Sequence, residues 1–311
     1  MSRHPSLSGL KLVLGGNVFG WTADQDTSFE ILDAFYEAGG RMVDTAEVYS
    51  AWVPGHSGGE SEKVIGAWMK ARGVRKDMRI ATKTGWGMEH GDLNPATLGT
   101  RLAGSLERLQ TDYVDLYYAH RDDPKTPQDE VVSAFSALID QGKVREAGAS
   151  NFTEERLRSA IAAAKAAGVR GFTVLQNQYN LLERGDYDDS LQNCCVVNDI
   201  AMLPFFGLAS GYLTGKYRKP ADFERYVRGG RVKKYHDGHG PALLAVMDRI
   251  AKECEATVAQ IALAWLLDQP GVAAPIASAT TADQLDELVE AIDIELMPEQ
   301  ILQLNKAVPQ E

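Results

Sequence analysis

Four polar residues have the types and the spacing for proton-transfer chemistry. Asp44, Lys83 and His120 each stand at the end of a short apolar segment, and Tyr49 follows Asp44 by five residues. An aspartate or a lysine alone in such a place is usually a helix cap or a surface residue. Three successive apolar segments that end in Asp, Lys and His indicate an active site more strongly.

The expected chemistry follows from the charges of these groups. A partly desolvated lysine keeps its charge only if an anion lies near, and Asp44 can be that anion. The ammonium of Lys83 would then stabilise the phenolate of Tyr49 and lower the pKa of its hydroxyl, so that Tyr49 could donate a proton near neutral pH. His120 could orient a carbonyl oxygen by hydrogen bonding. Such a set protonates an oxygen as a hydride reaches the adjoining carbon, or runs the reverse reaction.

Strand-like and helix-like segments alternate along the chain and would position these residues. The expected strands are 10–16, 41–45, 79–83, 113–120, 144–151, 174–180, 201–207 and 272–278. The first helices are expected at 27–38, 61–71, 94–109, 127–141 and 153–167. Eight such units predict α/β architecture, a single (β/α)8 TIM barrel over residues 1–311. Active sites of these barrels lie at the C-terminal strand ends, so Asp44, Lys83 and His120 should converge there.

Composition excludes some classes of function. The 311 residues carry a net charge of −11, so nucleic acid is not an expected partner. No apolar run has the length of a membrane span, and the N-terminal segment lacks the features of a secretion signal. Three cysteines, two of them adjacent, suit the reducing cytoplasm. Residues 216–234 hold eight Lys or Arg against two acids, which favours an anionic small ligand, with a solvated loop as the alternative.

The chain resembles the aldo-keto reductase superfamily over nearly its whole length, in particular the microbial branch related to potassium-channel β subunits. The motifs that carry the resemblance are DTAEVY (44–49), ATK (81–83), DLYYAH (115–120), GASNF (148–152), LQNQYN (175–180), GLASGYLTGKY (207–217) and QLDE (284–287). The resemblance implies a catalytic tetrad of Asp44, Tyr49, Lys83 and His120. It also implies hydride transfer between a nicotinamide cofactor and an aldehyde, ketone or sugar-like carbonyl substrate, with Tyr49 as the proton donor.

The resemblance further implies that the cofactor binds without a Rossmann fold. Ser150, Asn151 and Gln176 would bind the carboxamide, and Phe205 would stack on the nicotinamide in place of the usual tyrosine. Lys216 and the loop before it would wrap the pyrophosphate. The other expected cofactor residues are Gly16, Asn17, Asp44, Gly207, Leu208, Ala209, Gly211, Ser278, Thr280 and Gln284.

NADP is the expected cofactor, and NAD is the alternative. In the family the last motif often carries an Arg or Lys that pairs with the 2′-phosphate of NADP. Thr280 and Thr281 stand in that place here, and hydroxyl groups add no charge. Leu288 replaces an Asn that often contacts adenine.

Several residues are candidates for substrate contact. Trp21, Trp52 and Trp86 follow the first three strands and could stack on a sugar or an aromatic ring, or could simply pack within their loops. Arg121 and the two aspartates after it could bind a polyol or be solvated. The loops 51–60, 85–92 and 217–240 would shape the pocket. No metal is expected, because only two histidines lie together in residues 236–239.

Other functions compete with a carbonyl reductase. An NAD-dependent sugar or alcohol dehydrogenase would run the same chemistry in the oxidative direction. A non-catalytic, cofactor-sensing subunit is a second alternative, which an intact tetrad disfavours. A metal-dependent barrel hydrolase would need paired histidines after the first strand, and a glycosidase would leave Lys83 without a role.

Overall fold

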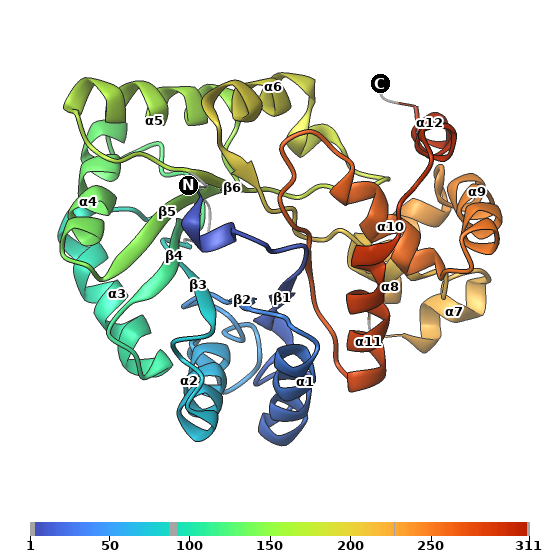
Figure 1. The fold of residues 1–311 in the computed structure, drawn as a ribbon, viewed down its shortest axis with the longest axis horizontal. Coiled ribbons are helices and arrows are strands. Elements are labelled where there is room, and N and C mark those ends of the chain that lie inside the picture. The colour runs from blue at the N-terminus through green and yellow to red at the C-terminus, as the bar shows by residue number, and fades with distance from the viewer. Residues whose placement is uncertain (1–3, 87–91, 227, 310–311) are drawn as a thin grey trace.

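The computed structural model describes residues 4–86, 92–226 and 228–309. Eight parallel strands form one sheet in the order β7-β6-β5-β4-β3-β2-β1-β8. They are β1 (Val13–Gly15), β2 (Met42–Asp44), β3 (Arg79–Thr84), β4 (Val114–Ala119), β5 (Val144–Ser150), β6 (Val174–Gln176), β7 (Ala201–Met202) and β8 (Ile276–Ala277). The sheet curls on itself and helices surround it (Figure 1). The expected (β/α)8 fold is confirmed.

The helices fall into a ring and a group beside it. The ring contains α1 (Gln25–Glu37), α2 (Glu60–Arg72), α3 (Pro95–Leu109), α4 (Gln128–Asp140), α5 (Glu154–Ala167), α6 (Asp189–Asn198), α10 (Val258–Leu267) and α11 (Ala282–Glu290). The group holds α7 (Pro220–Arg225), α8 (Gly229–His236), α9 (Gly240–Glu253) and α12 (Pro298–Ala307), at the right of Figure 1. None of the helices in the described ranges combines the length and the apolar character needed to cross a membrane.

The segment 217–240, expected as a loop, folds into α7, α8 and the start of α9. Pro220 occupies the first position of α7, where its missing N–H costs nothing. Val232 and Tyr235 stand three residues apart on α8, and both are buried. The many charged residues of this segment favoured the prediction of a loop, although the buried residues of α8 have helical spacing. Residues 87–91 of the expected loop 85–92 lie outside the described residues.

The last two strands are much shorter than their sequence segments. Pro204 and Pro275 lie within the segments 201–207 and 272–278, and proline has no N–H for the ladder. The segments around β7 and β8 are joined by isolated backbone contacts and not by a continuous ladder. Met202 bridges Val272, and the backbone N–H of Ile276 donates to Pro204 O at 2.9 Å.

Alternation along the strands carries polar side chains into the barrel mouth. Met42 and Ala81 belong to the apolar cluster that fills the barrel interior. Asp44 and Lys83 stand two residues further along β2 and β3, so they face the same way. His120 follows β4 directly. A second, larger apolar layer lies between the sheet and the helices.

One ion pair ties two helices of the ring together and gives a stability prediction. Glu62 on α2 is fully buried, and it accepts hydrogen bonds from Arg108 Nε and from Thr82 Oγ1, both at 2.6 Å. Arg108→Met leaves the Glu62 carboxylate without its cationic partner. A buried charge without such a partner destabilises the folded state. The free energy of unfolding should fall by about 3–5 kcal/mol in urea titrations.

Two further variants control this experiment. Adding Glu62→Gln to Arg108→Met should recover part of the loss, because the stranded charge is removed. Arg249→Ala breaks an exposed pair with Glu253 and should change stability by about 0.5 kcal/mol or less. Equal losses in Arg108→Met and Arg249→Ala would contradict the assignment of Glu62 as a buried anion.

Candidate active site

Lys83 is the centre of the candidate site. Its side chain is fully buried, and Nζ donates to Asp44 Oδ2 at 2.5 Å, to the Tyr49 hydroxyl at 2.8 Å and to Thr45 O at 2.9 Å. All three donors of the ammonium are therefore used. The other oxygen of Asp44, Oδ1, accepts from Gln176 Nε2 at 2.9 Å. Strands β2, β3 and β6 thus meet through side chains at one point of the barrel mouth.

His120 completes the set from β4. Its ring centroid lies 6.0 Å from that of Tyr49. Its backbone is held on two sides: the N–H donates to Thr84 O at 2.8 Å, and the carbonyl accepts from Asn151 Nδ2 at 2.9 Å. The ring atom Nδ1 is buried and has no hydrogen-bond partner in the described part of the chain. A buried polar atom without a partner is rare and points to a ligand contact.

Burial sets the protonation of the two bases. It lowers the pKa of the Lys83 ammonium, while the negative charges of Asp44 and Glu62 raise it. The pKa of the His120 imidazole lies well below its usual value, first because the ring is buried and second because the Lys83 charge is near. His120 is therefore neutral at neutral pH and can donate or accept one hydrogen bond at each nitrogen.

The prediction that the pKa of Tyr49 is lowered is wrong. Burial raises the pKa of Tyr49 well above its usual value, and the negative charge of Asp44 raises it further. Lys83 does donate a hydrogen bond to the phenol, but its charge lies only 2.5 Å from the Asp44 carboxylate. The anion that keeps Lys83 in the barrel also repels a phenolate. Tyr49 is consequently a protonated phenol at neutral pH.

The residues expected around the nicotinamide lie along β5, β6 and β7. Ser150 and Gln176 face each other in the register of β5 and β6, and both are buried. Asn151 adopts a left-handed backbone with φ of 56°, which Asn tolerates better than most residues. The ring of Phe205 follows β7 and packs against Phe206, with 5.2 Å between the centroids. These side chains line one side of the mouth.

The loop after β7 has an unusual backbone. It contains Phe206, Gly207, Leu208, Ala209, Ser210 and Gly211. Phe206, Ala209 and Ser210 have φ of 55°, 47° and 56°, although none of them is glycine. Such strain costs about 1–3 kcal/mol for each residue and gathers at functional sites. Leu208 and Ala209, with φ of −96° and 47°, form one right-handed and left-handed pair, an arrangement that points successive N–H groups into a concavity and favours an anion. A Cβ on Gly211 would lie 3.4 Å from Lys216 Nζ, so the cation lies against this loop.

The remaining expected cofactor residues lie where the first and last strands pair. Ser278 Oγ donates to Asn17 Oδ1 at 2.6 Å, which ties the turn at Gly16–Val18 to the end of β8. Gly16 is buried at the start of that turn. Thr280 precedes α11, and its N–H and its hydroxyl both donate to Gln284 Oε1 in that helix at 3.0 Å. Neither Thr280 nor Gln284 adds positive charge at this end of the mouth.

The expected substrate residues gather near Tyr49. Trp52 contacts the Tyr49 ring edge-on at 6.0 Å and the Trp21 ring at 5.6 Å. Trp86 lies 4.7 Å from the imidazole of the site, and the guanidinium of Arg121 lies 5.5 Å above the Trp86 ring. The sequence motifs placed these four residues on separate loops, and the fold brings them to the same side of the mouth as the phenol.

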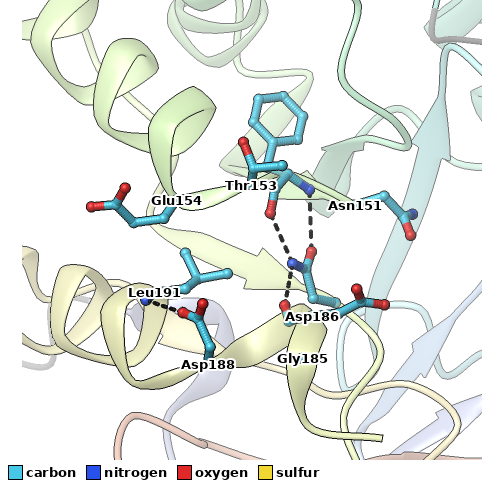
Figure 2. Close-up of a pocket in the computed structure, with 9 residues that line it drawn as sticks. Asn151, Thr153, Glu154, Gly185, Asp186, Asp188 and Leu191 are labelled. Atoms are coloured by element: carbon cyan, nitrogen blue, oxygen red, sulfur yellow. Dashed lines mark hydrogen bonds between the residues drawn. The ribbon is translucent and has the colours of Figure 1, made fainter. Parts of the chain in front are cut away.

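A cavity of 290 Å³ lies beside this mouth, and sequence reasoning missed it (Figure 2). Asn177 holds its wall: Nδ2 donates to Phe152 O at 2.9 Å and to Asp186 O at 2.8 Å. These bonds fix the loop that carries Asn151. Burial raises the pKa of the Asp186 carboxyl, and the charge of Glu183 adds to the shift. Asn177 thus positions this loop.

The comparison with known families decides the identity of the fold. A model of the Aldo/keto reductase family matches residues 11–309. The chain belongs to this family. It is 32% identical to aldo-keto reductase str7 of Strobilurus tenacellus, over 93% of this chain and 83% of that protein. It is 31% identical to an aryl-alcohol dehydrogenase (NADP(+)) of Phanerodontia chrysosporium, over 93% and 77% of the two chains.

A third relative confirms the expected branch. The chain is 31% identical to a probable voltage-gated potassium channel subunit beta of Oryza sativa subsp. japonica, over 94% of this chain and 90% of that protein. This aldo/keto reductase is therefore an NAD(P)-dependent oxidoreductase. The strained loop after β7, the Lys216 ammonium against it and the His120 nitrogen that has no partner among the described residues fit a nicotinamide dinucleotide and its substrate at this mouth.

The loop after β7 predicts how this aldo/keto reductase responds to loss of one charge. Lys216→Gln should weaken binding of NADPH by about tenfold or more, because a charged hydrogen bond contributes about 1.5–3 kcal/mol. Quenching of tryptophan fluorescence measures the dissociation constant. Lys219→Gln removes an exposed lysine of the same segment and serves as the charge-matched control. Equal effects of the two variants would show that only the general charge of the segment matters.

Proposed function

We propose that this aldo/keto reductase reduces the carbonyl group of an aldehyde or ketone, with NADPH as the preferred cofactor and Tyr49 as the proton donor. The observation that carries the proposal is the position of Lys83 Nζ, which is bonded at once to the Asp44 carboxylate and to the Tyr49 hydroxyl. The phenol is held in place at the C-terminal end of the strands. Steady-state reduction of a panel of aldehydes and ketones, followed at 340 nm, tests it directly.

Each side chain has a task in this proposal. The Tyr49 hydroxyl gives its proton to the carbonyl oxygen as the C=O bond is reduced. Neutral His120 offers a hydrogen bond that orients the same oxygen. Lys83 stabilises the phenolate that forms when Tyr49 gives up its proton, and Asp44 holds Lys83 in position. The bound nicotinamide supplies the hydride, and Ser150, Asn151, Gln176 and Phe205 would hold its ring.

The raised pKa of Tyr49 supports the reductive direction. A proton donor must carry its proton, and Tyr49 carries it throughout the neutral range. Oxidation of an alcohol needs the phenolate instead, and the fraction of phenolate falls tenfold with each pH unit below the pKa. Reduction is therefore favoured at neutral pH, and the alternative of an oxidative alcohol dehydrogenase would require alkaline conditions.

The charge around the loop supports NADPH over NADH. Burial and the neighbouring Arg228 lower the pKa of Lys216, and burial and Arg231 lower that of Arg228. These three cations form no ion pair within the described part of the chain, so an additional phosphate would relieve their repulsion. Thr280 weighs against NADPH, since it adds no charge. Equal or better kcat/KM with NADH would overturn the preference.

The proposal extends to the whole chain and its surroundings. We infer that residues 1–311 act as one reductase domain on a small carbonyl compound, without nucleic acid. Cys194, Cys195 and Cys254 are free thiols, which supports a reducing compartment such as the cytoplasm. A non-catalytic sensing subunit remains the alternative, and binding of NADPH without turnover of any carbonyl compound would favour it.

Tyr49→Phe should separate proton transfer from cofactor binding. The variant removes the donated proton but keeps the ring, so kcat should fall by about 10²–10⁴-fold. The dissociation constant for NADPH should stay within about twofold of wild type, because the phenol is not proposed to contact the cofactor. Tyr113→Phe, just before β4 at the opposite end of the barrel, is the matched control. Retention of more than about a tenth of kcat in Tyr49→Phe would assign the proton to another group.

Lys83→Met should change the pH dependence of the oxidative reaction. The ammonium donates to the Tyr49 oxygen at 2.8 Å and so favours the phenolate. Without it, Asp44 stays as an unpaired negative charge beside the phenol, and the pKa of Tyr49 rises further. The oxidative pH–rate profile should therefore move to higher pH than in wild type. A residual activity with an unchanged profile would show that Asp44, Lys83 and Tyr49 are not coupled.

A further inference from the structure

Three indole rings surround the two groups that would contact the carbonyl oxygen. Trp52 packs against Tyr49, and Trp86 packs against His120. Trp52 and Trp86 are 49% and 45% exposed, and Trp21 extends the cluster by its edge contact with Trp52. Exposed indoles at a barrel mouth offer large flat surfaces that a ring-shaped ligand covers better than water does. This geometry suits a planar substrate.

Arg121 lies at the edge of this aromatic cluster, and its charge has no ion-pair partner among the residues that the structure describes. Arg121 directly follows His120 in the sequence. Its guanidinium lies over the Trp86 ring, 5.5 Å from the ring centroid. It is only partly buried and forms no hydrogen bond or ion pair within the described residues. A guanidinium carries five N–H donors in a planar fork that matches a carboxylate. A guanidinium held on a ring beside the reactive centre is therefore prepared for an anion.

The two aspartates next to Arg121 do not neutralise it. Asp122 accepts from Arg156 Nε at 2.7 Å and from Gln128 Nε2 at 3.1 Å. Asp123 is buried and accepts from the backbone N–H groups of Leu93 and Lys125, at 3.1 and 3.0 Å. Both carboxylates are thus already engaged by hydrogen bonds from the protein, those of Asp122 coming from α4 and α5.

These contacts also weigh against a polyol substrate. A sugar would need acceptors for its hydroxyl hydrogens, and the carboxylate oxygens after Arg121 are already engaged by the protein. Among the described residues of this part of the mouth, Arg121 and the aromatic faces remain available to a ligand. The protein as a whole carries a charge of −11, which repels anions at long range. A local cation at the mouth can therefore attract an anionic substrate even though the net charge of the protein is negative.

From this we propose that the preferred substrate is an aromatic aldehyde or ketone that carries a carboxylate on the far side of its ring. The inference rests on the proposed carbonyl reductase function. The ring lies among Trp21, Trp52 and Trp86, and the carboxylate pairs with Arg121. At the carbonyl carbon a hydride from NADPH adds, the C=O π bond breaks, and the oxygen takes the proton of Tyr49. The carboxylate itself is unchanged in the reaction.

The position of Arg121 sets which isomer fits. A series of contacts runs from the Tyr49 ring to the His120 imidazole, then to the Trp86 indole, and from Trp86 to the Arg121 guanidinium. A substrate that reaches both ends of this series of contacts carries its carbonyl group and its carboxylate on opposite sides of its ring. A para arrangement provides this separation, and 4-formylbenzoate is the simplest probe. Methyl 4-formylbenzoate has nearly the same shape without the charge.

The first experiment measures kcat/KM for 4-formylbenzoate and its methyl ester with NADPH. Wild type should prefer the acid over the ester by about tenfold or more. Arg121→Gln should reduce the ratio of acid to ester by about 10- to 100-fold, through KM for the acid. Arg121→Lys should restore part of the ratio, because it returns the charge without the planar fork. Lys125→Gln removes an exposed cation nearby and should leave the ratio unchanged.

A binding measurement separates this inference from the proposed function. Terephthalate has no carbonyl to reduce, and tryptophan fluorescence in the presence of NADP should report its binding. Its dissociation constant should rise by about tenfold or more in Arg121→Gln and stay the same in Lys125→Gln. Benzaldehyde turnover without a preference for the acid would overturn the substrate inference alone. Terephthalate binding that depends on Arg121, without turnover of any aldehyde, would support the anion site and overturn the reductase proposal. Terephthalate binding that ignores Arg121 would overturn the inference.

Discussion

The buried contact between Lys83 and Asp44 is the constraint on which the mouth of the barrel depends. Removing two charges from water is expensive, and the cost is recovered only if every donor and acceptor finds a partner. Thr45, Tyr49 and Gln176 supply those partners. One ion pair therefore ties β2, β3 and β6 together and leaves a phenol at a defined position above the strands.

The rest of the mouth divides into the strand ends and the loops and short helices that follow them. Strand ends hold the ion pair, and the helices buttress them through contacts such as the one between Glu62 and Arg108. Loops and short helices carry the aromatic and cationic side chains that would distinguish ligands. The strained backbone between Phe206 and Gly211 belongs to the second group, and the buried packing around it keeps it in place. Chemistry and selectivity thus rest on different structural elements.

Much of this arrangement could be predicted from the sequence. Alternating apolar segments and helical periods predict the eight units, and Gly168 follows α5 in a left-handed conformation, which is common for a glycine at a helix end. Because a strand has a period of two, Asp44 and Lys83 share the direction of the apolar side chains before them. Their convergence follows from the fold class alone. The family resemblance then adds the tetrad and the cofactor residues, whose roles are proposals.

Other properties were decided only by the tertiary structure. The pKa of Tyr49 was expected to fall because the sequence indicated a nearby cation, but it rises because burial and the Asp44 charge also act on the phenol. Likewise, the sequence places Arg121 beside two acids, yet those acids accept hydrogen bonds from other groups, and the guanidinium has no ion-pair partner in the described part of the chain. The physical reason is the same in both cases. Sequence order determines which groups a strand end presents, whereas electrostatics depends on distances and burial that residues far apart in the chain create together.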